Sequence, residues 1–275
     1  MNFYRVKCAK VGEMGFQPIV VGTGLVAWRN LQRTLPSQME VFSNSAEQKR
    51  LTTHFEQKAG SLRSAEDVVA DRQILSVALG AYGLQDDLSN RFFVKRILAE
   101  GASDADSLAN RMSDSRYKNL ATDFAFDGLG SFVGLLPSTA EEMIHNYRAQ
   151  SFAVLVGETR PNLRLALNAE TEFQKLADLD VSEDAKWFLV MGNPPLRSVL
   201  ETALGLPASF GQLDIDKQLE VFRDKSLSTF GVGEIDELAS HGLSSDVIDR
   251  FLLRDQLKQG QSYSSQNIAL QLLSA

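Results

Sequence analysis

Two stretches of this chain share a pattern that constrains its fold. Residues 74–84 have the sequence ILSVALGAYGL, and residues 196–206 have the sequence LRSVLETALGL. At one fixed offset five of the eleven positions are identical. Each stretch has helical spacing, ends at a glycine and is followed by an acid-containing loop and then a helix with basic residues. Five matches in common residues can also arise from ordinary helix patterning. The matching order of the flanking features nevertheless favours an internal duplication.

Helix-start signals recur along the chain. The capping-box pattern, or its aspartate variant, occurs at Ser37-x-x-Glu40, Ser64-x-x-Asp67, Ser103-x-x-Asp106 and Ser138-x-x-Glu141. Apolar residues then follow at helical spacing. Pro194 and Pro195 are expected to open another helix, which Gly205 closes. Further helices are predicted at 163–177, 214–224, 235–241 and 246–257.

Strand signals are few. The clearest are Ile19-Val20-Val21 and 152–156, and the second follows a helical pattern, so we interpret it as a buried helix end. Asn-Gly or Asp-Gly turns do not join two alternating runs. We therefore predict an all-α, multihelical protein made of two related helical halves. The first half spans 14–127 and the second spans 138–258, with a Gly/Ser/Phe-rich linker at 128–137.

The ends of the chain need separate interpretation. Basic residues before the apolar run at 19–28 faintly imitate a secretory signal, but Glu13 and Pro18 interrupt it and no cleavage pattern follows. The sequence from Met14 resembles a natural start, so we expect 1–13 to be a non-native or disordered extension. Residues 259–275 carry Ile268, Leu270, Leu272 and Leu273 after a Gln/Ser-rich spacer. We expect a tail or short helix, either part of the core or a partner-binding segment.

Composition excludes several function classes. The net charge of −7 argues against a basic nucleic-acid interface, and the single cysteine, Cys8, excludes an intramolecular disulfide. A membrane-spanning apolar run is absent. His54, His145 and His241 lie far apart, so we predict no metal site.

Catalytic motifs are missing as well. The stretch at 20–27, VVGTGLVA, has the form of a dinucleotide fingerprint but lacks the surrounding βαβ pattern. We interpret it as a lead-in to the first helix, with Trp28 and Leu31 docking on the core. A nucleophile elbow and a P-loop are also missing. We therefore predict a protein that is not an enzyme and has no cofactor.

Two polar stretches are the candidates for partner docking. One lies just before the first repeat helix and the other forms a helix with a basic face. Capping and an inter-helix ion pair would explain them structurally, whereas a docking surface would use arginine and phenylalanine as anchors. The candidate residues are Asp71, Arg72, Asn90, Phe93, Lys95 and Arg96.

Several blocks together resemble the family called domain of unknown function 1217. The blocks that carry the resemblance are Phe16-Gln-Pro, 27–34, 64–72, 75–84, 93–101, 108–111, Arg116-Tyr117, 165–167 and 203–207. The second half departs from the first in having Asn193-Pro-Pro where the first has Asp71-Arg-Gln. The resemblance implies a multihelical protein, found mainly in alphaproteobacteria and often encoded near flagellar genes. It supplies no catalytic residue.

The function expected from this resemblance is non-enzymatic. It would be an assembly, scaffold or chaperone-like factor of the bacterial flagellum that presents helix surfaces to protein partners. One alternative is an exported structural component of the flagellar basal body or axis. Another is a small-molecule-binding protein with a pocket between the halves. We expect the protein to be cytoplasmic, or associated with or exported through the basal body. We also expect it not to bind nucleic acid and not to span a membrane.

Overall fold

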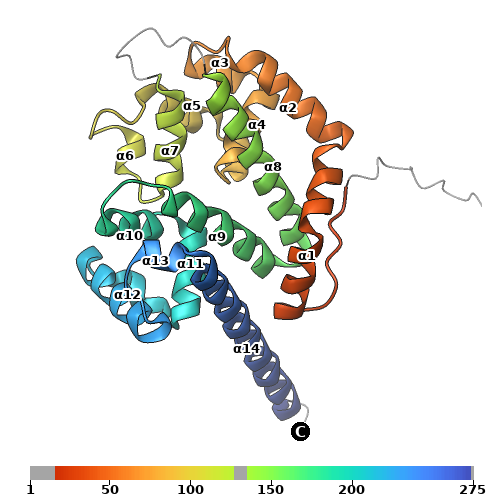
Figure 1. The fold of residues 1–275 in the computed structure, drawn as a ribbon, viewed down its shortest axis with the longest axis vertical. Coiled ribbons are helices and arrows are strands. Elements are labelled where there is room, and N and C mark those ends of the chain that lie inside the picture. Colours follow the sequence, from red (N-terminus) through yellow and green to blue (C-terminus); the bar gives the residue numbers. More distant parts are fainter. Residues whose placement is uncertain (1–15, 127–134, 274–275) are drawn as a thin grey trace, which may run out of the picture.

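The structure, a computed structural model, describes residues 16–126 and 135–273, with side chains described as far as Lys258 apart from those of Ala208 and His241. Within these residues the chain is all-α and contains no strand, as the sequence predicts. Figure 1 shows two groups of helices, with α1 lying along the side of both. The predicted extension at 1–13 and most of the predicted linker at 128–137 lie outside the described residues.

The elements follow one another as a series of helices. Those up to the middle of the chain are α1 (Gly24–Ser43), α2 (Ala46–Ala59), α3 (Ala65–Ala70), α4 (Arg72–Ala81), the 3-10 helix η1 (Gln85–Ser89), α5 (Arg91–Glu100), α6 (Leu108–Arg111), α7 (Ser115–Phe124) and α8 (Pro137–Thr159). The remaining elements are α9 (Pro161–Ala177), α10 (Glu183–Met191), α11 (Pro194–Leu204), η2 (Ala208–Gln212), α12 (Ile215–Phe230), α13 (Ile235–Ala239) and α14 (His241–Leu273).

Two large hydrophobic clusters hold these helices together. One is formed by α2 to α5, α7 and the first part of α8, around Phe55 and Phe124. The other is formed by α9 to α14 together with α1 and the last part of α8, around Trp28 and Trp187. The clusters therefore do not divide the chain at the predicted linker, because α8 contributes to both and α1 packs against the later helices. The predicted docking of Trp28 and Leu31 on the core is confirmed, since both are almost completely buried.

The helix ends around the two repeated stretches correspond closely. The carboxamide of Asn193 caps α11 and the carboxylate of Asp71 caps α4. Each helix ends before a glycine in the left-handed region, with φ of +69° at Gly83 and +72° at Gly205. A 3-10 helix, a longer helix and a short helix follow in both halves. This common order supports the duplication, which remains a hypothesis.

Some local signals led to wrong helix starts. Ser37 and Glu40 lie inside α1, because the helix packs on the core on both sides of them, through the buried Leu31 and Phe42 and the half-buried Leu35 and Met39. No helix begins at Ser103; the carboxylate of Asp104 instead accepts a hydrogen bond from the Asp106 N–H at 2.9 Å, which forms a turn. The helix predicted at Ser138 begins one residue earlier, at Pro137.

Other signals predicted the backbone correctly. The capping box of Ser64 and Asp67 is confirmed at the start of α3. Pro194 and Gly205 bound α11 as predicted. The segment 152–156 is helical, as interpreted, and forms part of α8.

The strand signal at Ile19-Val20-Val21 is not realised as a strand. The Ile19 N–H donates to Oε1 of Gln38 at 2.7 Å, and Nε2 of Gln38 donates to the Ile19 carbonyl at 3.1 Å. One amide side chain on α1 thus satisfies the backbone groups that a neighbouring strand would otherwise pair. Among the described residues, none of the helices is both long enough and apolar enough to cross a membrane.

Candidate functional site between the halves

A groove of about 790 Å³ lies between the halves. Its walls come from the end of α4, from α7 and α8, and from α9 and the start of α11. This is the size range of pockets that bind small molecules or short segments of chain. The sequence suggests a pocket between the halves only as an alternative function, and it does not predict the residues that line one.

Three helices present polar side chains to this groove at matching intervals. Each contributes positions i, i+4 and i+8, which lie on one face of a helix. The nine residues are Ser115, Asn119 and Asp123 on α7, Glu142, Asn146 and Gln150 on α8, and Arg164, Asn168 and Glu172 on α9. An asparagine stands in the middle of each of the three stripes, so the groove offers both donors and acceptors.

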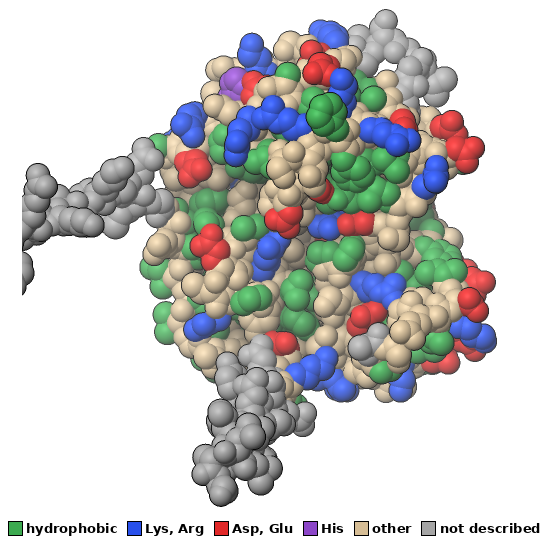
Figure 2. All heavy atoms as spheres, turned by 180° about the vertical axis from the view of Figure 1, so that it is seen from behind, with side chains coloured by type: hydrophobic (Ala, Val, Ile, Leu, Met, Phe, Trp, Pro, Cys, Tyr) green, Lys and Arg blue, Asp and Glu red, His purple; other side chains and the backbone are tan. Residues whose placement is uncertain are grey.

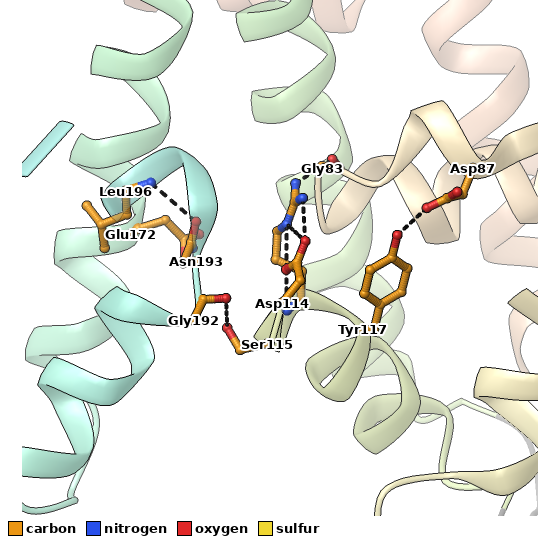
Figure 3. A network of polar contacts seen from close by, with 10 residues as sticks. Gly83, Asp87, Asp114, Ser115, Tyr117, Glu172, Gly192, Asn193 and Leu196 are labelled. Atoms are coloured by element: carbon orange, nitrogen blue, oxygen red, sulfur yellow. Dashed lines mark hydrogen bonds and ion pairs between the residues drawn. The ribbon is translucent and has the colours of Figure 1, made fainter. Parts of the chain in front are cut away.

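A polar network ties the two halves together at the edge of the groove (Figure 3). The N–H and the hydroxyl of Ser115 both donate to the Gly192 carbonyl, at 2.7 and 2.9 Å. Next to it, Nδ2 of Asn193 donates to Oε2 of Glu172 at 2.8 Å. The Asn193 Oδ1 accepts from the Leu196 N–H at 3.3 Å, so one side chain both caps α11 and positions Glu172.

Arg116, on α7, belongs to the same network and binds the backbone at the end of α4. Its guanidinium donates to both carboxylate oxygens of Asp114, and Nη1 donates to the Gly83 carbonyl at 2.8 Å (Figure 3). Both charged side chains are largely buried, with 22% and 15% of their surface exposed. The guanidinium is therefore a structural link between α7 and the end of α4.

Charged groups collect at one end of the groove. The Tyr82 hydroxyl donates to Asp123. Glu142 lies close enough to raise the pKa of both groups. Displacement of solvent raises the pKa of Asp123, and repulsion by Glu142 raises it further, while the Tyr82 hydrogen bond and the charge of Lys175 lower it. Burial and the same carboxylates also raise the pKa of Tyr82 far above its ordinary value. This end is thus acidic, and Tyr82 stays protonated.

Gln150 is the most unusual group in the groove. Its side chain is only 8% exposed, and its Oε1 is buried without a hydrogen-bond partner among the described residues. A side chain on Gly83 would bring its Cβ to 3.4 Å from this oxygen, so Gly83 lies directly beside it. Unpaired buried acceptors are costly and rare in native proteins.

A second cavity of about 670 Å³ lies between α2, α4 and α8. Phe16 and Phe42 form its apolar end, and Tyr147 and Gln48 lie at its polar end. Burial raises the pKa of Tyr147, while hydrogen bonds from Ser151 and Gln48 lower it. Because the Tyr147 ring packs directly against Gly80, this cavity is narrowed where α4 and α8 meet.

The structure places the six predicted docking residues outside both cavities. Two of them have clear structural roles on α4 and η1. Asp71 caps α4 and accepts a hydrogen bond from Nε2 of His54 at 2.6 Å. Nδ2 of Asn90, at the end of η1, donates to Oδ1 of Asp87 at 2.7 Å. Arg72, the third candidate in this region, is exposed.

The three candidates on α5 also make local contacts. Phe93 packs edge-on against Tyr117 with ring centroids 5.3 Å apart. Lys95 pairs with Glu66 on α3, and Arg96 pairs with Glu100 within α5. Ring packing and ion pairing therefore account for these three residues, and docking stays a prediction.

A metal site is not apparent in the part of the chain that the structure describes, where no three His, Cys, Asp or Glu side chains converge. His145 is exposed on α8, and His54 is engaged with Asp71. On the face shown in Figure 2, basic and acidic side chains are interspersed.

Comparison with known proteins identifies the family. The model of the family described as "Protein of unknown function (DUF1217)" matches residues 81–238. The chain belongs to this family. A protein of Agrobacterium tumefaciens, solved by X-ray crystallography in a structural genomics programme, is 25% identical with a TM-score of 0.67. That match covers 88% of this chain and 97% of the other. No curated protein matches the chain.

Sequence reasoning missed the groove, although a signal was present. Asn146, Gln150 and Asn168 occupy positions on α8 and α9 that lie beside apolar residues, and two of them are almost completely buried. Buried amides at i and i+4 in helices of an otherwise apolar pattern indicate a polar interface. The pattern could not show that α7, α8 and α9 face one another.

Proposed function

We propose that this chain is a non-enzymatic assembly or scaffold factor that works by holding protein partners, and that its partners belong to the bacterial flagellum. Membership of the family supports the flagellar part only through the resemblance described above. The observation that carries the protein-binding part is the length of α14, which runs for 33 residues to Leu273.

The first part of α14 packs on the core. Val247, Ile248, Phe251 and Leu252 are buried in the cluster around Trp187, whereas Leu257 is 67% exposed. The helix continues past that point, and Figure 1 shows its C-terminal part extending away from the other helices. Helices gain most of their stability from packing an apolar face. A continuation of this length is therefore suited to packing against a partner.

The experiment is an in-frame deletion in the source organism, scored by swimming and by electron microscopy of flagella. Strains carry a plasmid with the full chain or with a chain ending at Lys258. We expect the deletion to lose filaments or basal bodies, the full chain to restore them, and the shortened chain to fail at equal protein level. Normal flagella in the deletion strain would overturn the flagellar proposal.

A fractionation of the same strains separates the scaffold from an exported component. A scaffold factor is expected in the soluble fraction of the cell. Its recovery in purified hook–basal bodies would instead favour the structural component of the axis, and would contradict the scaffold proposal.

A further inference from the structure

The groove between the halves has the chemistry of a site for an extended peptide. We propose that it binds a stretch of about six residues from a protein partner, hydrogen-bonded through the buried amides of Gln150 and Asn168. This inference rests on the proposed function, because it names the part of a partner that the scaffold would hold.

The first argument is the unpaired oxygen of Gln150. An acceptor that is buried with no partner lowers the stability of the free protein. A peptide N–H in the groove is a donor that would satisfy it once the Gln150 side chain, which lines the groove, turns its amide oxygen toward the bound chain. Gly83 lies beside this oxygen, and any side chain at that position would contact it. Because glycine has no side chain, the backbone of a bound peptide has room to come close.

The second argument is the shape of the lining. The residues of α9 that line the groove run from Pro161 to Leu176, which at 1.5 Å per residue is roughly 20 Å. An extended chain of about six residues covers that length at roughly 3.3 Å each. A compact metabolite would leave part of such a groove empty. Side-chain amides match peptide groups because each carries a donor and an acceptor.

The third argument is the distribution of charge. Arg164 lies near the turn between α8 and α9, since its side chain packs on Gly157. Asp123 and Glu142 lie toward the opposite end of the α8–α9 pair. A bound peptide would therefore place an acidic side chain or its terminal carboxylate at Arg164. A basic side chain or its amino terminus would lie at the other end.

The test uses the full-length protein and phage displaying random heptapeptides. Enriched sequences are synthesised with a fluorophore, and binding is measured by anisotropy. For Gln150→Leu we expect binding on the order of tenfold weaker, because one buried hydrogen bond is lost. The melting temperature of this variant should equal or exceed that of wild type, since the unpaired acceptor is gone. Gln57→Leu, the same change at an exposed position of α2, is the matched control and should bind like wild type.

A second variant tests orientation without touching the buried amides. Arg164→Gln should weaken the binding of peptides that carry an acidic residue or a free carboxylate at one end. The binding of their amidated, uncharged forms should stay unchanged. Failure to enrich any sequence over a blank surface would overturn the proposal, as would equal binding to Gln150→Leu. Complete displacement of the peptides by single amino acids at the same molar concentration would also overturn it, by showing a small-molecule site. The assay needs no flagellar protein, so its failure is distinct from that of the deletion experiment.

Discussion

Replacing Asn193 by aspartate tests why the two corresponding helix caps carry different residues. Aspartate is as good an N-cap as asparagine, and Asp71 caps α4 in the first half. The neighbours differ, however. Asp71 faces the ring of His54, whereas Asn193 donates to the carboxylate of Glu172. In Asn193→Asp the cap is kept, but two carboxylates meet where a donor and an acceptor met before.

The size of the effect follows from these contacts. Losing a hydrogen bond to a charged group costs about 1.5–3 kcal/mol. Repulsion between two unit charges 4 Å apart reaches about 4 kcal/mol near a protein surface, before the groups move apart. Lys175, 3.0 Å from Glu172, offsets part of this repulsion. We expect the free energy of unfolding to fall by about 2–4 kcal/mol at pH 7, with a melting temperature about 5–10 °C lower.

The pH dependence gives an independent check. Repulsion raises the folded-state pKa of one carboxyl of the new pair above its unfolded value. The penalty is therefore present above that raised pKa and is relieved as the pH falls and the group takes up a proton. The difference from wild type should shrink between pH 7 and about pH 4, as measured by urea unfolding followed through the fluorescence of Trp28 and Trp187, which share one cluster.

The matched control is the reciprocal change, Asp71→Asn. Burial raises the pKa of Asp71, but hydrogen bonds from His54 and from the first N–H groups of α4 together bring it below its ordinary value. Asp71 thus stabilises the fold above its unfolded pKa and loses this effect as the pH falls. Both partners are about a third exposed, so the loss should stay below about 1 kcal/mol at pH 7. If Asn193→Asp were no less stable than Asp71→Asn, the reasoning from neighbouring charge would be refuted.

Three further changes probe other parts of the fold. Gly205→Ala should lower the free energy of unfolding by about 1–2 kcal/mol or more, because φ is +72° and a Cβ would collide with Arg254; a melting temperature equal to wild type would contradict this. Lys186→Met removes the buried ammonium whose hydrogen bond lowers the pKa of Asp236. The Lys186–Asp236 pair stabilises the fold above the unfolded-state pKa of the aspartate, and this stabilisation is lost as the pH falls. The melting temperature of Lys186→Met should therefore fall less steeply between about pH 5 and pH 3 than that of wild type. Parallel curves of melting temperature against pH would show that the Lys186–Asp236 pair does not contribute to stability. Ser64→Ala breaks the capping box of α3 and should lower the free energy of unfolding, measured with urea, by about 1 kcal/mol. Ser64→Asp should keep most of the stability that the cap provides.

Much of the backbone follows from signals that act within a few residues. Ser64 accepts from an N–H three residues on, Pro194 lacks only a donor that would be unpaired in any case, and Gly205 adopts a conformation that other residues resist. These effects are local, so the sequence alone determined the all-α fold, the start of α3 and the bounds of α11. It also determined that the stretches around Gly83 and Gly205 would end in the same way.

The tertiary structure decided what local signals could not. Whether Ser37 starts a helix depends on the apolar face of α1, which is buried against residues far along the chain. Whether Ile19 joins a strand depends on Gln38 satisfying its backbone groups. The groove needs three helices to turn their polar stripes toward one another, and the charge beside Asn193 comes from Glu172 on another helix. Burial and charge act through space, so these outcomes depended on packing between segments distant in sequence.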